Sequence, residues 1–157
     1  MQSSQKHFAV YTSSVGNYFF REISDLIAAG LRQIGARVTI RNENEQFLSD
    51  ADWHVIVAPH EFLYLGLGEL RRQEGLPENS IIVNTEQPST EWFALAYTMF
   101  HHAKKIWDID YHSMENISAL GFDCSYLPLG YVPGFTSYDK IENLPDTDFM
   151  NFDRRTR

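Results

Sequence analysis

The hydrophobic residues of the chain fall into short β-prone runs separated by longer stretches with helical spacing. From residue 18 to residue 34 the apolar positions recur every three or four residues, which places them on one face of a helix, and Gly35 is a natural stop. Residues 80–83 are almost entirely apolar, as in a strand that is buried on both faces. The whole pattern predicts strands at 8–11, 37–40, 53–58, 80–83, 106–109 and 124–127, and helices at 18–34, 62–73, 91–103 and 113–120.

This alternation predicts an α/β fold, a Rossmann-like three-layer α/β/α sandwich whose sheet is mostly parallel and connected by right-handed crossovers. We expect the domain to span residues 1–131. Residues 132–147 carry Pro, Gly, Ser, Asn and Asp without periodicity and are expected to form a linker. Residues 148–157 are too few to complete another strand and helix unit.

Composition narrows the classes of function. The chain has 157 residues, 43% of them hydrophobic, which suits one globular domain. It carries 21 acidic and 13 basic residues, and this balance argues against nucleic-acid binding, which needs clustered Lys and Arg. A single cysteine, Cys124, and the lack of a long apolar run predict a cytoplasmic protein without a signal peptide or membrane span.

Ligands of open parallel sheets bind beyond the carboxyl ends of the strands, so the loops there hold the candidate site. The first such loop offers hydroxyls and a flexible glycine at the start of a helix, where an anion or a hydroxyl group could bind: Ser13, Ser14, Gly16 and Asn17. It lacks the glycine fingerprints of NAD- and ATP-binding loops. Helix capping by Ser14 or Asn17 is the alternative interpretation.

Two further strand ends carry chemistry. His60 follows an apolar strand and precedes Glu61, whose carboxylate could orient the imidazole for use as a base, although an ordinary loop histidine fits as well. Asn84, Glu86 and Gln87 leave the most apolar strand in succession, a set of amide and carboxylate groups suited to sugar hydroxyls. Trp92 and Tyr97 lie close by in sequence and could stack on a sugar ring. A polar turn before a helix is the alternative.

A last polar cluster follows the strand at 106–109. It includes Asp108, Tyr111 and His112 as binding or catalytic candidates, and helix capping by Asp110 or Ser113 is the competing explanation. No set of His, Cys or carboxylate residues has a recognisable zinc spacing, so we predict no metal site.

Three segments in this order resemble motifs of a known family: IVNTEQ at 82–87, IWDIDYHS at 106–113 with Asn116, and LPLGY at 127–131. They are similar to the N-x-E-Q, V-W-D-Y-S and P-L-G-Y patterns in the N-terminal domain of bacterial GT-B-fold glycosyltransferases of the glycosyl transferases group 1 type. The resemblance covers residues 8–135 in expected topology, and its specific motifs span 81–131.

The resemblance implies that this chain is the acceptor-side half of a two-domain enzyme, and that a C-terminal domain of the same protein binds the nucleotide-sugar donor. Residues 146–150 with Arg154 and Arg155 resemble the first strand of that second domain, but Asn151, Phe152 and Asp153 replace the small donor loop of the family. We therefore expect the 157-residue portion alone to be inactive. The resemblance implies no metal or other cofactor.

The resemblance also implies roles for individual residues. His60, Glu86 and Asp108, in that order, are the candidates for the base that deprotonates the acceptor hydroxyl. Gly16 and its neighbouring serines would approach the donor phosphates or the acceptor. Two alternatives stay open. The chain could be a flavodoxin-like FMN-binding protein, because residues 13–18 partly resemble the phosphate-binding loop of such proteins. It could also be a non-catalytic module that binds a sugar or a partner.

Overall fold

The computed structural model describes residues 5–135, where all six predicted strands and three of the four predicted helices are present, with ends that differ by up to three residues. In chain order they are β1 (His7–Tyr11), α1 (Tyr18–Gln33), β2 (Arg37–Arg41), β3 (Trp53–Val57), α2 (Pro59–Phe62), α3 (Gly68–Glu74), β4 (Ser80–Asn84), α4 (Glu91–Phe100), β5 (Lys105–Asp108), α5 (Tyr111–Ala119) and β6 (Cys124–Tyr126).

The strands form a single six-stranded sheet in the order β2-β1-β3-β4-β5-β6, and every neighbouring pair is parallel. The predicted α/β class and Rossmann-like three-layer architecture are confirmed. The order doubles back once, so that β1 lies between β2 and β3, as in the flavodoxin-like variant of doubly wound folds. All carboxyl ends of the strands therefore meet at one edge, and the point where the order reverses lies between β1 and β3.

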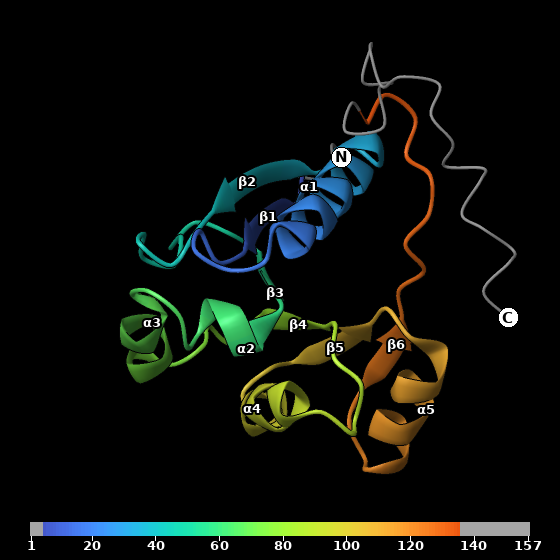
Figure 1. Ribbon diagram of the computed structural model, residues 1–157. Coiled ribbons are helices and arrows are strands. Elements are labelled where there is room, and N and C mark those ends of the chain that lie inside the picture. Colours follow the sequence, from blue (N-terminus) through green and yellow to red (C-terminus); the bar gives the residue numbers. More distant parts are fainter. Residues whose placement is uncertain (1–4, 136–157) are drawn as a thin grey trace, which may run out of the picture.

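Helices cover both faces of the sheet, as Figure 1 shows, with α1 on one face and α2, α4 and α5 on the other. Strand β4 explains why both faces need cover, because all of its residues are buried. Ile82 packs into the core beneath α4, whereas Ile81 and Val83 pack into the core beneath α1. Alternation of side chains along a strand thus divides one apolar run between two hydrophobic cores.

Side-chain caps fix where three helices begin. Asn17 accepts a hydrogen bond from the Phe19 N–H at the start of α1 (3.0 Å), and Thr90 accepts one from the Phe93 N–H at the start of α4 (3.0 Å). Asp110 caps α5 by accepting from the Ser113 N–H (2.8 Å). Because Asp110 and not Ser113 is the cap, α5 begins two residues earlier than the pattern predicts.

The prediction of one helix at 62–73 is wrong, because α2 ends at Phe62 and the next helix, α3, begins only at Gly68. Gly66 adopts a left-handed φ of 55°, which interrupts the helical path. Gly68 then packs so closely against the Phe62 carbonyl that no Cβ would fit there. Helix α4 also ends at Phe100, three residues before its predicted end.

The predicted domain boundaries are only partly visible. Most of the expected linker at 132–147, and all of the expected start of a second domain at 148–157, lie outside the described residues. Between residues 5 and 135, no helix is long and apolar enough to cross a membrane.

The double-sided burial of β4 predicts a large effect of truncation in its centre. Ile82→Ala is expected to lower the free energy of unfolding by about 3 kcal/mol, since it removes buried methyl groups and leaves a cavity. Ile34→Ala is the matched control, because that side chain is 79% exposed, and it should change stability by less than about 0.5 kcal/mol. Urea denaturation measures both variants, and equal losses would contradict this account of the core.

Candidate functional site

The loop after β1 is held in place by two carboxylates from other loops. Glu43 accepts hydrogen bonds from the Ser14 N–H (2.7 Å) and from the Ser14 hydroxyl (2.6 Å), and only 1% of its surface is exposed. Glu61 accepts a hydrogen bond from the Asn17 N–H (2.7 Å), at the first turn of α1. Gly16 lies between these contacts, and a Cβ there would collide with the Glu61 carboxylate and displace it from its present position.

These contacts change the interpretation of the loop as an anion site. The backbone N–H groups of Ser14 and Asn17, which could have bound a phosphate, already donate to carboxylates inside the protein. The positive end of the α1 dipole therefore faces the negative charge of Glu61. Of the predicted binding residues in this loop, Ser14, Gly16 and Asn17 thus hold the loop together, and Ser13, which is 2% exposed, lines a small pocket beside it.

His60 lies just beyond β3, at a sharp turn into α2. Ala58, the residue between strand and helix, has a φ of 51°, a left-handed conformation that costs energy for any residue with a Cβ. The turn places the His60 ring in a buried position with an exposed fraction of 2%, edge-on to Phe20 (5.3 Å between centroids) and beside Trp92 (6.0 Å). Backbone strain of this kind is concentrated at functional sites.

Glu86 is the carboxylate that faces His60. Its Oε1 lies 3.4 Å from His60 Nε2, and its Oε2 accepts a hydrogen bond from the Thr90 hydroxyl (3.2 Å). The expectation that Glu61 orients the imidazole is wrong. Successive residues on a helix point in different directions, and Glu61 faces Asn17 instead.

Burial sets the protonation state of His60. It lowers the pKa of the imidazole to about 4, so the ring is neutral near pH 7 although a carboxylate stands in front of it. His60 Nδ1 is buried and has no hydrogen-bond partner among the described residues. Burial also raises the pKa of the Glu61 carboxyl, and the negative charge of Glu86 acts in the same direction. The site thus holds a neutral imidazole with one uncommitted nitrogen.

Asp108 and Asn84 form a separate, buried hydrogen-bond network at the ends of β5 and β4. Asp108 accepts hydrogen bonds from the Asn84 amide (2.8 Å), the Ser113 hydroxyl (2.7 Å) and the Asp110 N–H (2.8 Å). Burial raises the pKa of Asp108, although these hydrogen bonds act in the opposite direction. The same Asn84 amide also donates to the backbone carbonyl of Glu86 (2.7 Å), which ties this network to the turn that carries Glu86.

The remaining predicted site residues do not join this group. Gln87 is exposed, and its backbone carbonyl accepts from Thr90. Tyr111 is 52% exposed and packs edge-on against Tyr126 (5.6 Å). The His112 ring is exposed, and its Nδ1 lies 3.4 Å from a carboxylate oxygen of Glu115. Within residues 5–135, no contact connects Tyr111 or His112 to His60, and no group of three His, Cys or acidic residues could hold a metal ion.

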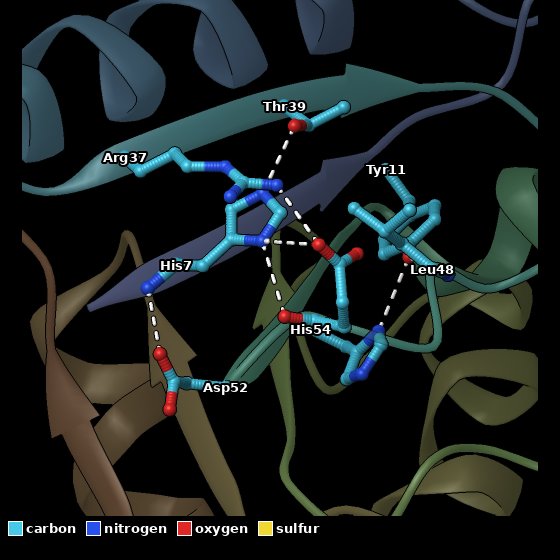
Figure 2. A network of polar contacts seen from close by, with 8 residues as sticks. His7, Tyr11, Arg37, Thr39, Leu48, Asp52 and His54 are labelled. Atoms are coloured by element: carbon cyan, nitrogen blue, oxygen red, sulfur yellow. Dashed lines mark hydrogen bonds and ion pairs between the residues drawn. The ribbon is translucent and has the colours of Figure 1, made fainter. Parts of the chain in front are cut away.

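A polar network that sequence reasoning missed fastens the segment 42–52, which carries Glu43, to the sheet (Figure 2). The Tyr11 hydroxyl accepts from the Leu48 N–H (2.9 Å) and lies 3.1 Å from His54 Nδ1. His7 contacts the Thr39 hydroxyl through Nε2 (3.0 Å). Burial lowers the pKa of His54, so this ring is neutral near pH 7, and in the tautomer with its hydrogen on Nε2 its Nδ1 accepts from the Tyr11 hydroxyl. The one available signal was the presence of histidines within two otherwise β-prone apolar strands.

Comparison with protein families, with curated proteins and with solved structures gives no match to this chain.

The lowered pKa of His60 predicts that the protein loses stability as the pH falls. Above 6.5 the ring is neutral in both the folded and the unfolded chain, whereas between 6.5 and about 4 only the unfolded chain takes up the proton. The contribution of the neutral His60 ring to the free energy of unfolding is therefore fully present above pH 6.5. About 3 kcal/mol of it is lost as the pH falls to about 4, since one pKa unit corresponds to about 1.4 kcal/mol. The lowered pKa of His54 adds to this loss.

Urea denaturation at a series of pH values measures the effect. His60→Gln should make the dependence on pH shallower, because it removes the group that only the unfolded chain protonates. His112→Gln is the matched control, because the His112 side chain is 88% exposed, and it should leave the curve unchanged. A His60→Gln curve as steep as that of the wild type would refute the assignment.

Proposed function

We propose that this chain is the acceptor-side domain of a GT-B-type glycosyltransferase, and that His60 is the base that removes the proton from the acceptor hydroxyl. One observation carries the proposal. A buried neutral imidazole with a carboxylate at one nitrogen lies at the ligand-binding edge of a parallel sheet, beside the exposed ring of Trp92. The motif resemblance at 82–87, 106–113 and 127–131 supports it.

The chemistry needs a base with a free lone pair. An alcohol attacks an anomeric carbon poorly until its proton is removed. With the hydrogen of His60 on Nε2, facing Glu86, the lone pair is on Nδ1. In the proposed step the hydroxyl proton moves to Nδ1, the hydroxyl oxygen bonds to the anomeric carbon of the donor, and the diphosphate leaves with the electrons of its bond to the sugar. Glu86 stabilises the imidazolium that forms.

The other candidates have different roles in this proposal. Asp108 already accepts three hydrogen bonds and holds the turn after β4 through Asn84, so it acts as a positioning residue. Trp92 is 53% exposed on the first turn of α4 and supplies a flat surface for the C–H face of an acceptor sugar. Because His60 Nδ1 is buried, the proposal requires that side chains around the ring move to admit the acceptor, and of the two rings beside it, Phe20 and Trp92, only Trp92 is exposed. The donor nucleotide-sugar belongs to the second domain that the resemblance implies.

The flavodoxin-like alternative has one observation in its favour, the strand order, in which FMN would bind near β1 and β3. The loop contacts argue against it. A flavin phosphate would meet Glu43 and Glu61 at the N–H groups that it needs, and two carboxylates repel a dianion. The non-catalytic module differs from the glycosyltransferase only in lacking turnover, so it is separated by experiment.

Sugar binding is tested first on this chain. Methyl glycosides of glucose, galactose, mannose and N-acetylglucosamine are titrated while amide and indole shifts are followed by NMR. We expect at least one glycoside to shift the Trp92 indole and the Glu86 amide, and Trp92→Ala to weaken that binding at least about tenfold, since stacking and burial of an aromatic ring contribute on the order of 1.5 kcal/mol. Trp53→Phe is the control. If Trp92→Ala and the wild type bind the glycoside with the same affinity, Trp92 is not part of the sugar site.

The role of His60 is tested in the full-length gene product with nucleotide-sugars and the acceptor that binds. His60→Gln should lower transfer by about 10²-fold or more and change acceptor affinity by less than about threefold, because a general base acts in the transition state and not in the bound ground state. His101→Gln is the control. Undiminished turnover in His60→Gln would overturn the assignment, and sugar binding without any turnover of the wild type would favour the non-catalytic module.

A further inference from the structure

A second candidate site is a polar pocket next to the loop 12–17, at the carboxyl ends of β1 and β2. We call it the β1–β2 pocket. Its volume is about 190 Å³, room for about six water molecules at their liquid volume, which suits a single monosaccharide unit. Its lining comes from the loop after β1, the first half of α1, the end of β2 and the loop after β2: Thr12, Ser13, Ser14, Arg21, Asp25, Ile40, Arg41, Asn42 and Glu45.

Several polar groups in this lining are not committed to partners inside the protein. The Ser13 hydroxyl accepts from the Val15 N–H (3.3 Å), so its own hydrogen is available, and both Ser13 and Thr12 are buried against the pocket. Arg21 stacks on the Tyr18 ring (5.4 Å), but in the described part of the chain no carboxylate lies within ion-pair distance of it. Within the same residues, Asp25 likewise has no cationic partner.

The charges of the lining balance. The lining contains two arginines and two carboxylates, and one of the arginines forms an ion pair, with Arg41 Nε at 3.6 Å from Glu45 Oε1. The other pair, Arg21 and Asp25, is available one helical turn apart on α1. A site without net charge does not favour an anion. Carboxylate, guanidinium and hydroxyl groups around a small volume suit vicinal hydroxyl groups, which both donate and accept hydrogen bonds.

We infer that the β1–β2 pocket binds one neutral monosaccharide unit, with Asp25 and Arg21 contacting its hydroxyl groups and Thr12 and Ser13 at its base. The loop 12–17 connects the pocket with the neighbourhood of His60, because Ser13 and Ser14 line the pocket and the Asn17 N–H donates to Glu61, the residue after His60. The binding of a sugar in this pocket does not depend on the proposed function. If the proposed function holds, the pocket has a further role as a second sugar subsite, and the acceptor contains at least two sugar units.

The NMR titration with neutral methyl glycosides tests the pocket through its own reporters, the amides of Ser13, Ser14 and Asn42. We expect a neutral glycoside to shift these amides, and glucuronic acid and glucose phosphate to shift them less. Asp25→Asn and Arg21→Gln should each weaken this binding at least about tenfold, because each removes a charge-assisted hydrogen bond. Both side chains are exposed, so neither change threatens folding. Glu22→Gln, on the same helix but outside the lining, should bind as wild type does.

Three results would overturn the inference: no shift of these amides with any neutral glycoside, shifts with the charged sugars alone, or wild-type affinity in both Asp25→Asn and Arg21→Gln. The proposed function is tested by different measurements, the NMR shift of the Trp92 indole and the turnover of nucleotide-sugars. Trp92→Ala should leave glycoside binding in the β1–β2 pocket intact. Loss at the Trp92 site with binding retained here would therefore refute the proposed function and leave this pocket standing as a sugar site.

Discussion

Parallel pairing of all six strands is the constraint on which the rest of the structure depends. It forces every connection to cross the sheet and brings every carboxyl end to one edge, where the polar residues after each strand must share a small space. Several of them are buried there, including Glu43, Asn84 and Asp108, and buried polar groups require partners. The hydrogen bonds from Ser14, Ser113 and Asp110 to these carboxylates satisfy that requirement and fix the loops at the same time.

The need of buried polar groups for hydrogen-bond partners distinguishes residues that stabilise the loops from residues that are available for chemistry. Asp108 and Glu43 accept hydrogen bonds from other groups of the protein, and these bonds hold both carboxylates and the loops around them in place. His60 differs, because it is buried at a strained turn and yet one of its nitrogens has no hydrogen-bond partner between residues 5 and 135. An unsatisfied buried group lowers stability, and proteins tolerate that loss most often where the group is used. Glu86 completes the pair from the turn that Asn84 anchors.

The sequence was sufficient for the fold and insufficient for the contacts of the site. Apolar periodicity located α1 and the strands because burial follows the repeats of helix and strand. The split at Gly66 was missed, since one glycine in an otherwise helical pattern does not reveal a left-handed φ. Neighbours in sequence were poor guides to neighbours in space. Glu61 follows His60 directly and faces away, whereas Glu86, 26 positions later, faces the ring. The roles of Glu43 and Asp25 depend on long-range packing that no local pattern encodes.

The charge at the ligand edge bears on the division of labour in the proposed enzyme. Glu43, Glu61, Glu86 and Asp108 bring four carboxylates to this edge, and two of them accept hydrogen bonds from the Ser14 and Asn17 N–H groups in the loop that leads into α1. A diphosphate brought here would meet that charge in a site of low dielectric, where repulsion is strong. A neutral sugar meets no such penalty and finds carboxylates and hydroxyls that accept its hydrogen bonds. In the proposed enzyme, the electrostatics of this domain would therefore favour a neutral acceptor over the nucleotide-sugar, whose phosphates would bind to a more basic surface.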